Sequence, residues 1–105
     1  MTEITSDFSG QTVICTFEMT PATAAELMER LQEAYRDLIS KAPGFLGAGL
    51  HMNDAHTRIA TYSKWRERGD YQAMLRSSEM IARNRVISTL CRSFEPVMYE
   101  IEASY

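Results

Sequence analysis

The 105-residue chain lacks several features that would assign it to a familiar functional class. It contains no apolar run near the roughly 18 residues that a membrane-spanning helix needs. No cluster of lysine and arginine forms a basic stripe, and the net charge is −3, which argues against nucleic acid as a partner. Glu3 and Asp7 stand where a signal peptide would be basic. We therefore expect a cytoplasmic protein without a membrane or nucleic-acid partner.

Cysteine and histidine are equally scarce, and their spacing excludes the common metal sites. The two cysteines, Cys15 and Cys91, form no C-x-x-C pair, and His51 and His56 form no H-x-x-x-H pair. The chain also has no glycine-rich nucleotide loop and no G-x-S-x-G elbow. These absences predict two free thiols in a reducing compartment, and a protein that holds no metal or other cofactor.

Strand and helix patterns alternate along what we expect to be a single domain, residues 1–105. The hydrophobic fraction is 45%, which is ordinary for a folded globular chain. Residues with a two-residue period predict strands, and a long amphipathic stripe opening at Thr20-Pro21 and ending at Pro43-Gly44 predicts a helix. The predicted strands are 12–19, 45–52, 57–65 and 94–103, and the later helical segments are 71–75 and 80–91.

The stretch from Thr57 to Leu75 carries the most informative pattern. An alternating strand ends at Trp65, Gly69 breaks it, and Asp70 is a good N-cap for a helix that opens with Tyr71. A Trp at the end of a strand and a Tyr at the start of the next helix can cover the same space, each with one polar tip. They could simply fill the core, or they could form the wall and lid of a small-molecule pocket.

The resulting order is β-α-β-β-α-β, which predicts an α+β, ferredoxin-like antiparallel sheet with its helices on one face. The first strand is apolar on both faces, with Val13 on one side and Ile14 on the other. An open sheet of this size leaves its second face exposed, so we expect two copies to pair through their sheets as a homodimer. Pro96, near the start of the last strand, favours either an edge position for that strand or a place at its entry.

The segment Pro43-Gly44-Phe45-Leu46, the strand ending at Trp65, then Tyr71 and the residues to Met80 resemble the antibiotic biosynthesis monooxygenase family. The resemblance spans residues 12–101 and is strongest toward the small anthrone oxygenases of aromatic polyketide pathways. It implies a dimeric α+β barrel that oxidises a polycyclic phenol to a quinone with molecular oxygen. It also implies that no metal, flavin or haem takes part.

The same resemblance implies a set of site residues. A His, a Trp, a Tyr and an Arg line the pocket of the polyketide oxygenases, and in register they fall on His51, Trp65, Tyr71 and Arg85. Thr61 stands where those enzymes carry an Asn. The full prediction assigns catalysis to these four residues, with Thr61, Phe45, Arg83 and Met80 as substrate-binding candidates.

Two details of this prediction conflict with local patterns. The simplest hairpin, with Asn53 to His56 as its loop, places His51 on the face of Arg58, away from Trp65, unless a bulge shifts the register. Helical periodicity places Arg83 nearer the interior than Arg85, whereas the family register favours Arg85. His51 is the plausible base of an oxidation, since its ordinary pKa is near neutral, but it could equally be structural.

Three functions fit these patterns. The first is a cofactor-independent monooxygenase that forms a quinone from a polycyclic phenol. The second is a non-redox protein that binds or cyclises a reactive polyketide in the same cavity. The third is a dimeric module without an enzymatic site.

Overall fold

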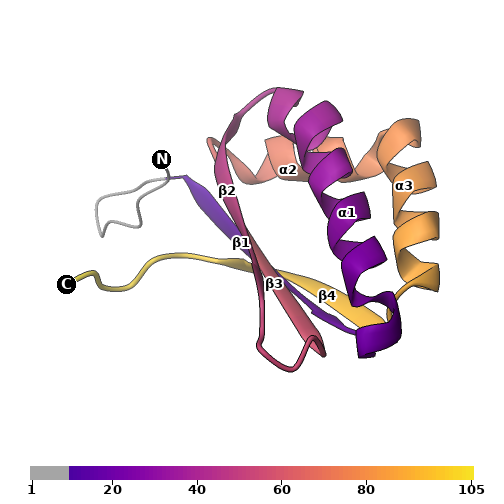
Figure 1. The fold of residues 1–105 in the computed structure, drawn as a ribbon. Coiled ribbons are helices and arrows are strands. Elements are labelled where there is room, and N and C mark those ends of the chain that lie inside the picture. The colour runs from indigo at the N-terminus through magenta and orange to yellow at the C-terminus, as the bar shows by residue number, and fades with distance from the viewer. Residues whose placement is uncertain (1–9) are drawn as a thin grey trace.

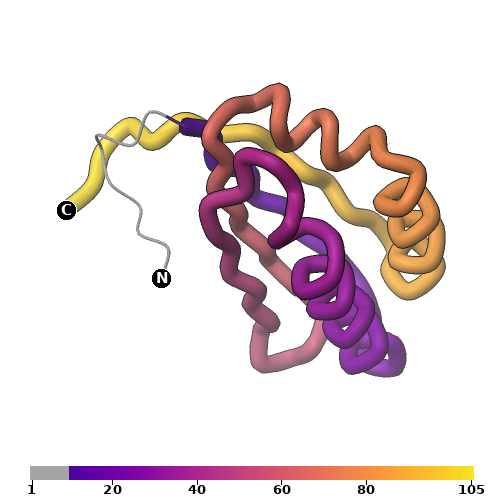
Figure 2. Tube along the Cα trace, turned by 90° about the horizontal axis from the view of Figure 1, so that it is seen from above, coloured from indigo at the N-terminus to yellow at the C-terminus, as the bar shows by residue number. Residues whose placement is uncertain are grey.

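The computed structural model describes residues 10–105 and has the predicted ferredoxin-like architecture. Four antiparallel strands form one sheet in the order β2-β3-β1-β4, and the helices lie against one of its faces (Figures 1 and 2). The elements in chain order are β1 (Gln11–Glu18), α1 (Pro21–Asp37), the short 3-10 helix η1 (Ile39–Lys41), β2 (Phe45–Met52), β3 (Arg58–Trp65), α2 (Arg68–Arg76), α3 (Ser78–Thr89) and β4 (Ser93–Tyr99). Within the described residues, no helix combines the length and the apolar character needed to cross a membrane.

Most element boundaries follow the local signals in the sequence. Pro21 occupies the first turn of α1, and the Ser77 hydroxyl accepts a hydrogen bond of 3.2 Å from the Met80 amide at the start of α3. Pro96 lies in β4, which is an edge strand, as predicted. The last strand ends at Tyr99, four residues earlier than the prediction, where its pairing with β1 stops.

The start of α2 differs from the prediction, because Asp70 is not its N-cap. The helix begins at Arg68 after Glu67, so Asp70 lies in its first turn. The Asp70 side chain lies against Gly44, whose φ is +83° and whose position a Cβ could occupy only by colliding with that carboxylate. A tertiary contact of Asp70 with the loop before β2 therefore replaces the local capping role.

The pairing of β2 with β3 decides which side chains face the helices. A bulge between Phe45 and Gly47 lets Phe45 pair with Trp65, and beyond it Leu50 pairs with Thr61. On the other side of β3, Thr61 pairs with Cys15. These side chains lie on the covered face, whereas the alternate positions, including Tyr62, lie on the open face.

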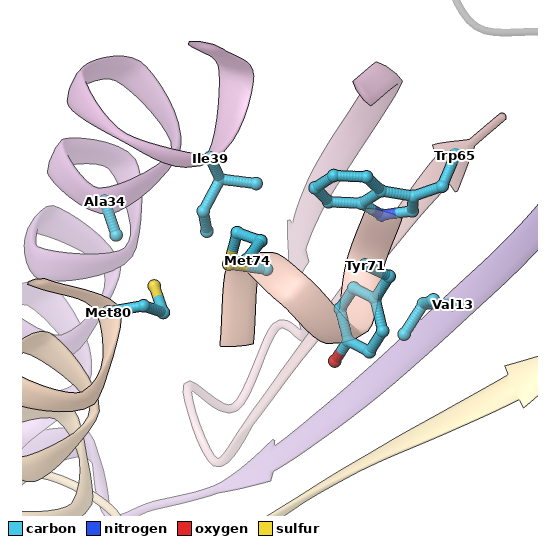
Figure 3. Packing of buried hydrophobic residues seen from close by; sticks show 7 residues of the cluster. All are labelled: Val13, Ala34, Ile39, Trp65, Tyr71, Met74 and Met80. Carbon is cyan, nitrogen blue, oxygen red and sulfur yellow. The ribbon is translucent and has the colours of Figure 1, made fainter. Parts of the chain in front are cut away.

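The core consists of two clusters that share the covered face of the sheet. One gathers around Trp65 and Tyr71, beneath α2 (Figure 3). The other gathers around Leu27 and Ile59, beneath α1. The candidate site lies between them.

Candidate functional site in the cavity between sheet and helices

A small cavity of about 60 Å³ lies over the middle of β1 and is lined by residues of all three α-helices. Its lining is mainly apolar and contains no Asp, Glu, His, Lys or Arg from the described residues. The lining residues are Cys15, Phe17, Leu31, Tyr35, Ile39, Thr61, Tyr71, Met74, Leu75, Met80, Asn84, Ile87, Phe94 and Pro96. Wider grooves of about 310 and 330 Å³ run over the outer side of the helices.

Tyr71 contributes a hydroxyl to the cavity that is available to hydrogen-bond a ligand. Its ring packs edge-on against Trp65, with ring centroids 5.6 Å apart. Figure 3 shows its hydroxyl turned away from Trp65, and that hydroxyl forms no hydrogen bond with any described residue. Burial raises the pKa of the Tyr71 phenol well above its ordinary value of 10. The group therefore remains a neutral hydrogen-bond donor across the physiological range.

Trp65 lies behind Tyr71 and does not line the cavity. It is completely buried, and its Nε1 donates a hydrogen bond of 2.9 Å to the Ser63 hydroxyl. Phe45 packs edge-on against the other side of the indole, at a centroid distance of 5.4 Å. Both residues were predicted to contact substrate, whereas the structure places them as a supporting layer around Tyr71.

Tyr35 and Thr61 form a hydrogen-bonded group on the opposite wall. The Tyr35 hydroxyl is hydrogen-bonded to the side chains of Thr61 and Ser63. Burial is the main cause that raises the pKa of Tyr35, and these hydrogen bonds partly oppose it. Sequence reasoning missed Tyr35 because its position fits the apolar stripe of α1, and the hydroxyl at the tip of the ring was the only signal. Thr61 lines the cavity as predicted, but Tyr35 already engages its hydroxyl.

Three residues of α3 line the cavity, Met80, Asn84 and Ile87, of which Met80 was a predicted site residue. Met80 lines the cavity, and Asn84 lies one turn further along the same face. Asn84 was missed, although an amide on the apolar face of a helix is itself a signal. Arg83 is half-buried and borders the outer groove between α1 and α3, with its Nε buried and unpaired, whereas Arg85 is exposed. Periodicity thus ranked the two arginines correctly, and neither lines the cavity.

His51 does not converge with the other predicted site residues, so the structure does not bring the expected set of four together. It pairs with Ala60 on the open face and stacks on Tyr62, with centroids 6.0 Å apart. The only register shift in β2 lies between Phe45 and Gly47, far from the hairpin, so simple alternation holds up to His51. A Cβ at Gly49 would meet the Tyr62 ring at 2.7 Å. The space that this glycine leaves is therefore filled by Tyr62.

Cys15 lies on the floor of the cavity, and both cysteines are free thiols as predicted. Burial raises the pKa of Cys15 from 9.0 to about 12. No group of three or more His, Cys, Asp and Glu side chains within residues 10–105 could hold a metal ion. The cavity therefore offers neutral hydrogen-bonding groups in an apolar space.

The raised pKa of Cys15 predicts a loss of stability in alkali. Between pH 9 and 12 the unfolded chain has released this thiol proton and the folded chain still holds it, so rising pH favours unfolding. We expect the free energy of unfolding, measured by urea denaturation, to fall above pH 9 by at most about 1.4 kcal/mol per pH unit from this group. Cys15→Ala should flatten the fall between pH 9 and 10, whereas an unchanged slope would contradict the assignment.

Comparison with known proteins identifies the family. The model of the family described as antibiotic biosynthesis monooxygenase matches residues 11–85. Tetracenomycin-F1 monooxygenase of Streptomyces glaucescens is 32% identical over 63 residues, which are 60% of this chain and 56% of that enzyme. The chain thus matches little more than half the length of that curated relative.

Solved structures show the same fold at lower identity. A mutant of SnoaB, a cofactor-independent oxygenase from Streptomyces nogalater, superimposes with a TM-score of 0.79 at 15% identity, covering 90% of this chain and 94% of that one. The monooxygenase ActVA-Orf6 of Streptomyces coelicolor, solved with nanaomycin D, gives a TM-score of 0.77 at 24% identity, covering 91% and 90%. With the family model matching most of its length, the chain belongs to the antibiotic biosynthesis monooxygenase family.

Proposed function

We propose that this protein is a cofactor-independent monooxygenase that oxidises a polycyclic phenol, of the anthrone type, to a quinone with molecular oxygen. The observation that carries the proposal is the Tyr71 hydroxyl, a neutral donor at an apolar cavity that has no hydrogen-bond partner among residues 10–105. The names of its relatives support the reaction class, since one is a monooxygenase for tetracenomycin F1 and another a cofactor-independent oxygenase.

The chemistry needs little from the protein. An anthrone loses a proton to give an electron-rich anion, which passes one electron to triplet oxygen. The radical pair recombines and forms a C–O bond, giving a peroxide. The O–O bond then breaks, the ring carbon loses its remaining proton, and the quinone carbonyl forms as water leaves. One anthrone and one O₂ therefore give one quinone and one water.

Tyr71 would stabilise the anion in this sequence by donating a hydrogen bond to its oxygen. The proton of the substrate has no obvious acceptor in the cavity, because His51 lies on the opposite face of the sheet. Burial raises the pKa values of Cys15, Tyr35 and Tyr71, so none of them is an anion near pH 7. We therefore propose that water takes the proton and that the substrate is itself a fairly acidic phenol.

The cavity must widen to admit such a substrate. Its volume of about 60 Å³ holds roughly two water molecules, whereas pockets for drug-sized ligands measure about 300 Å³ or more. Met74, Leu75 and Met80 form the wall on the side of α2 and α3. Thioether side chains change rotamer at low cost, so this wall is the part most able to move.

Oxygen uptake tests the proposal directly. The purified protein, treated with a metal chelator, is mixed with 1,8-dihydroxyanthrone in an oxygen-electrode cell while quinone absorbance is recorded. We expect one O₂ consumed per quinone formed, at a rate well above the spontaneous oxidation. Conversion of a polyketide model substrate without oxygen uptake would instead support the non-redox cyclase function, and no rate above background would overturn the oxygenase proposal.

The pH dependence of this activity should be set by the pKa of the substrate and not by an ionisable group of the protein. We expect kcat/KM to rise with pH up to the pKa of the phenol, without an inflection that moves with protein variants. His51→Ala should change kcat/KM by less than about threefold, because its side chain lies on the open face. A loss of 30-fold or more would restore His51 as the base, acting from a neighbouring subunit.

We also propose that the protein is a homodimer joined through the open face of the sheet. One row on this face runs across all four strands and is free of charge: Gly49, Tyr62, Ile14 and Val97 pair in turn. Leu46 on β2 and Tyr99 on β4 are about half exposed. An uncovered apolar row of this kind is typical of an interface.

The dimer predicts a solution mass of twice the 12.0 kDa of one chain at micromolar concentration. Ile14→Glu places a charge at the centre of the row and should shift the mass measured by light scattering to that of one chain. Far-ultraviolet circular dichroism checks that the variant is folded, and Glu29→Gln, at an exposed position of α1 away from the open face of the sheet, serves as the control. A parent protein with the mass of a single chain would rule out this assembly.

A further inference from the structure

We infer that Asn84 is a second substrate-recognition residue of the cavity and that it binds an oxygen of the substrate distinct from the one that Tyr71 contacts. The inference rests on the proposed function and adds to it the class of substrate, a polycycle with at least two oxygen functions. It starts from a residue that packing does not explain.

Asn84 occupies a position where the fold calls for an apolar side chain. It lies four residues after Met80 and three before Ile87, and both of these are buried on the inner face of α3. All three residues line the cavity. The Asn84 amide forms no hydrogen bond with any described residue, since the bonds of α3 side chains involve Ser88 and Thr89 only. Asn84 is only partly buried and its amide keeps some contact with solvent, so a ligand oxygen that enters the cavity can replace the water that satisfies the amide in the free protein.

The other polar side chains of the cavity are already engaged or weak. Tyr35 and Thr61 are hydrogen-bonded to each other. The Cys15 thiol is a weak donor and a weak acceptor. Only the Tyr71 hydroxyl on α2 and the Asn84 amide on α3 remain available among the residues that line the cavity. They come from two different helices, so a ligand with two oxygen functions could engage one of them at each group.

The amide has properties that suit this role. It carries two N–H donors and a carbonyl acceptor, so it can bind a carbonyl, a phenol or a phenolate without changing its charge. It does not titrate, and it therefore adds no pH dependence to binding. A substrate with a hydroxyl or carbonyl on a ring remote from the reacting carbon would engage Asn84 and Tyr71 together, which fixes its orientation.

Equilibrium binding to two probe molecules tests the inference without turnover. The probes are 1,8-dihydroxyanthraquinone and anthracene, which share three fused rings but differ in having oxygen functions. Trp65 is the only tryptophan of the chain and packs against Tyr71, so quenching of its fluorescence reports occupancy. Asn84→Leu keeps the branching at Cγ with a somewhat larger side chain and removes the hydrogen bonds, so the difference between the two probes, and not the affinity for either alone, is the readout. We expect it to weaken binding of the oxygenated probe about tenfold and to leave anthracene unchanged.

A structural role for Asn84 gives a different result. If Asn84→Leu changes the affinities for both probes by the same factor, the residue acts through packing and the inference is wrong. Asn84→Gln should recover part of the lost affinity for the oxygenated probe, and equal loss in both variants would also contradict recognition. If the parent protein binds the oxygenated probe and consumes oxygen while Asn84→Leu binds that probe with the same affinity, the assigned role of Asn84 is wrong and the proposed function stands. If the parent binds neither probe, the proposed function falls with it.

Discussion

Replacing Tyr71 with Phe is expected to lower kcat/KM for oxygen-dependent quinone formation by about 100-fold. The variant keeps the ring that packs on Trp65, with ring centroids 5.6 Å apart, and removes only the hydroxyl, which has no hydrogen-bond partner in the described part of the chain. Loss of one donor to an oxyanion in a water-excluded site typically costs a factor of 10² to 10³. The folded state should not suffer, because no hydrogen bond within the described structure is broken. The measurement is steady-state kinetics with oxygen uptake and quinone absorbance recorded together.

Tyr62→Phe is the matched control for this experiment. Tyr62 stacks on His51 on the open face of the same sheet, so the same atom is removed outside the cavity. Its kcat/KM should stay within about threefold of the parent. If Tyr71→Phe also stays within threefold, the phenol has no chemical role, and the cavity would bind substrate through shape alone.

The fold was predictable because its signals are local. Alternation in the strands, the stripe of α1, Ser77 before α3 and Pro96 in an edge strand each act over a few residues. The early start of α2 was not predictable, since the Asp70 carboxylate finds its place against Gly44 only in the folded chain. The tertiary contact of Asp70 therefore outweighed its local preference for the N-cap position.

The cavity was predictable only in part, because its lining depends on how separate elements are turned toward one another. Thr61, Tyr71 and Met80 were found, whereas Tyr35 and Asn84 belong to helices whose rotation about their own axes decides which side chains face the sheet. Strand register has the same effect on His51, since it decides on which face of the sheet this side chain lies. Its face was given correctly by counting back from the hairpin, and the family alignment overrode that count. A bulge close to His51 would have turned its side chain to the covered face, but the bulge in β2 lies at the other end of the strand.

Truncation of Trp65 is expected to have the largest effect on the free energy of unfolding, whereas loss of its N–H group alone should change kcat little. Its side chain is fully buried between Phe45 and Tyr71, with centroid distances of 5.4 and 5.6 Å. Truncation of a buried tryptophan to alanine usually costs about 3 to 5 kcal/mol, which is a large part of the stability of a small domain. We therefore expect Trp65→Ala to lower the free energy of unfolding in urea by that amount and to lose activity through collapse of the wall behind Tyr71.

Trp65→Phe separates this packing role from a chemical one. It keeps an aromatic ring and removes the N–H that donates to Ser63 at 2.9 Å. The lost hydrogen bond should cost about 1 kcal/mol of stability, and the smaller ring adds a cavity penalty of similar size. Because Nε1 is turned to Ser63 and the indole does not line the cavity, kcat should remain within about fivefold of the parent at a temperature where the variant is fully folded. A 100-fold loss of kcat in a stable Trp65→Phe protein would show that the indole N–H leaves Ser63 during turnover and acts on the substrate.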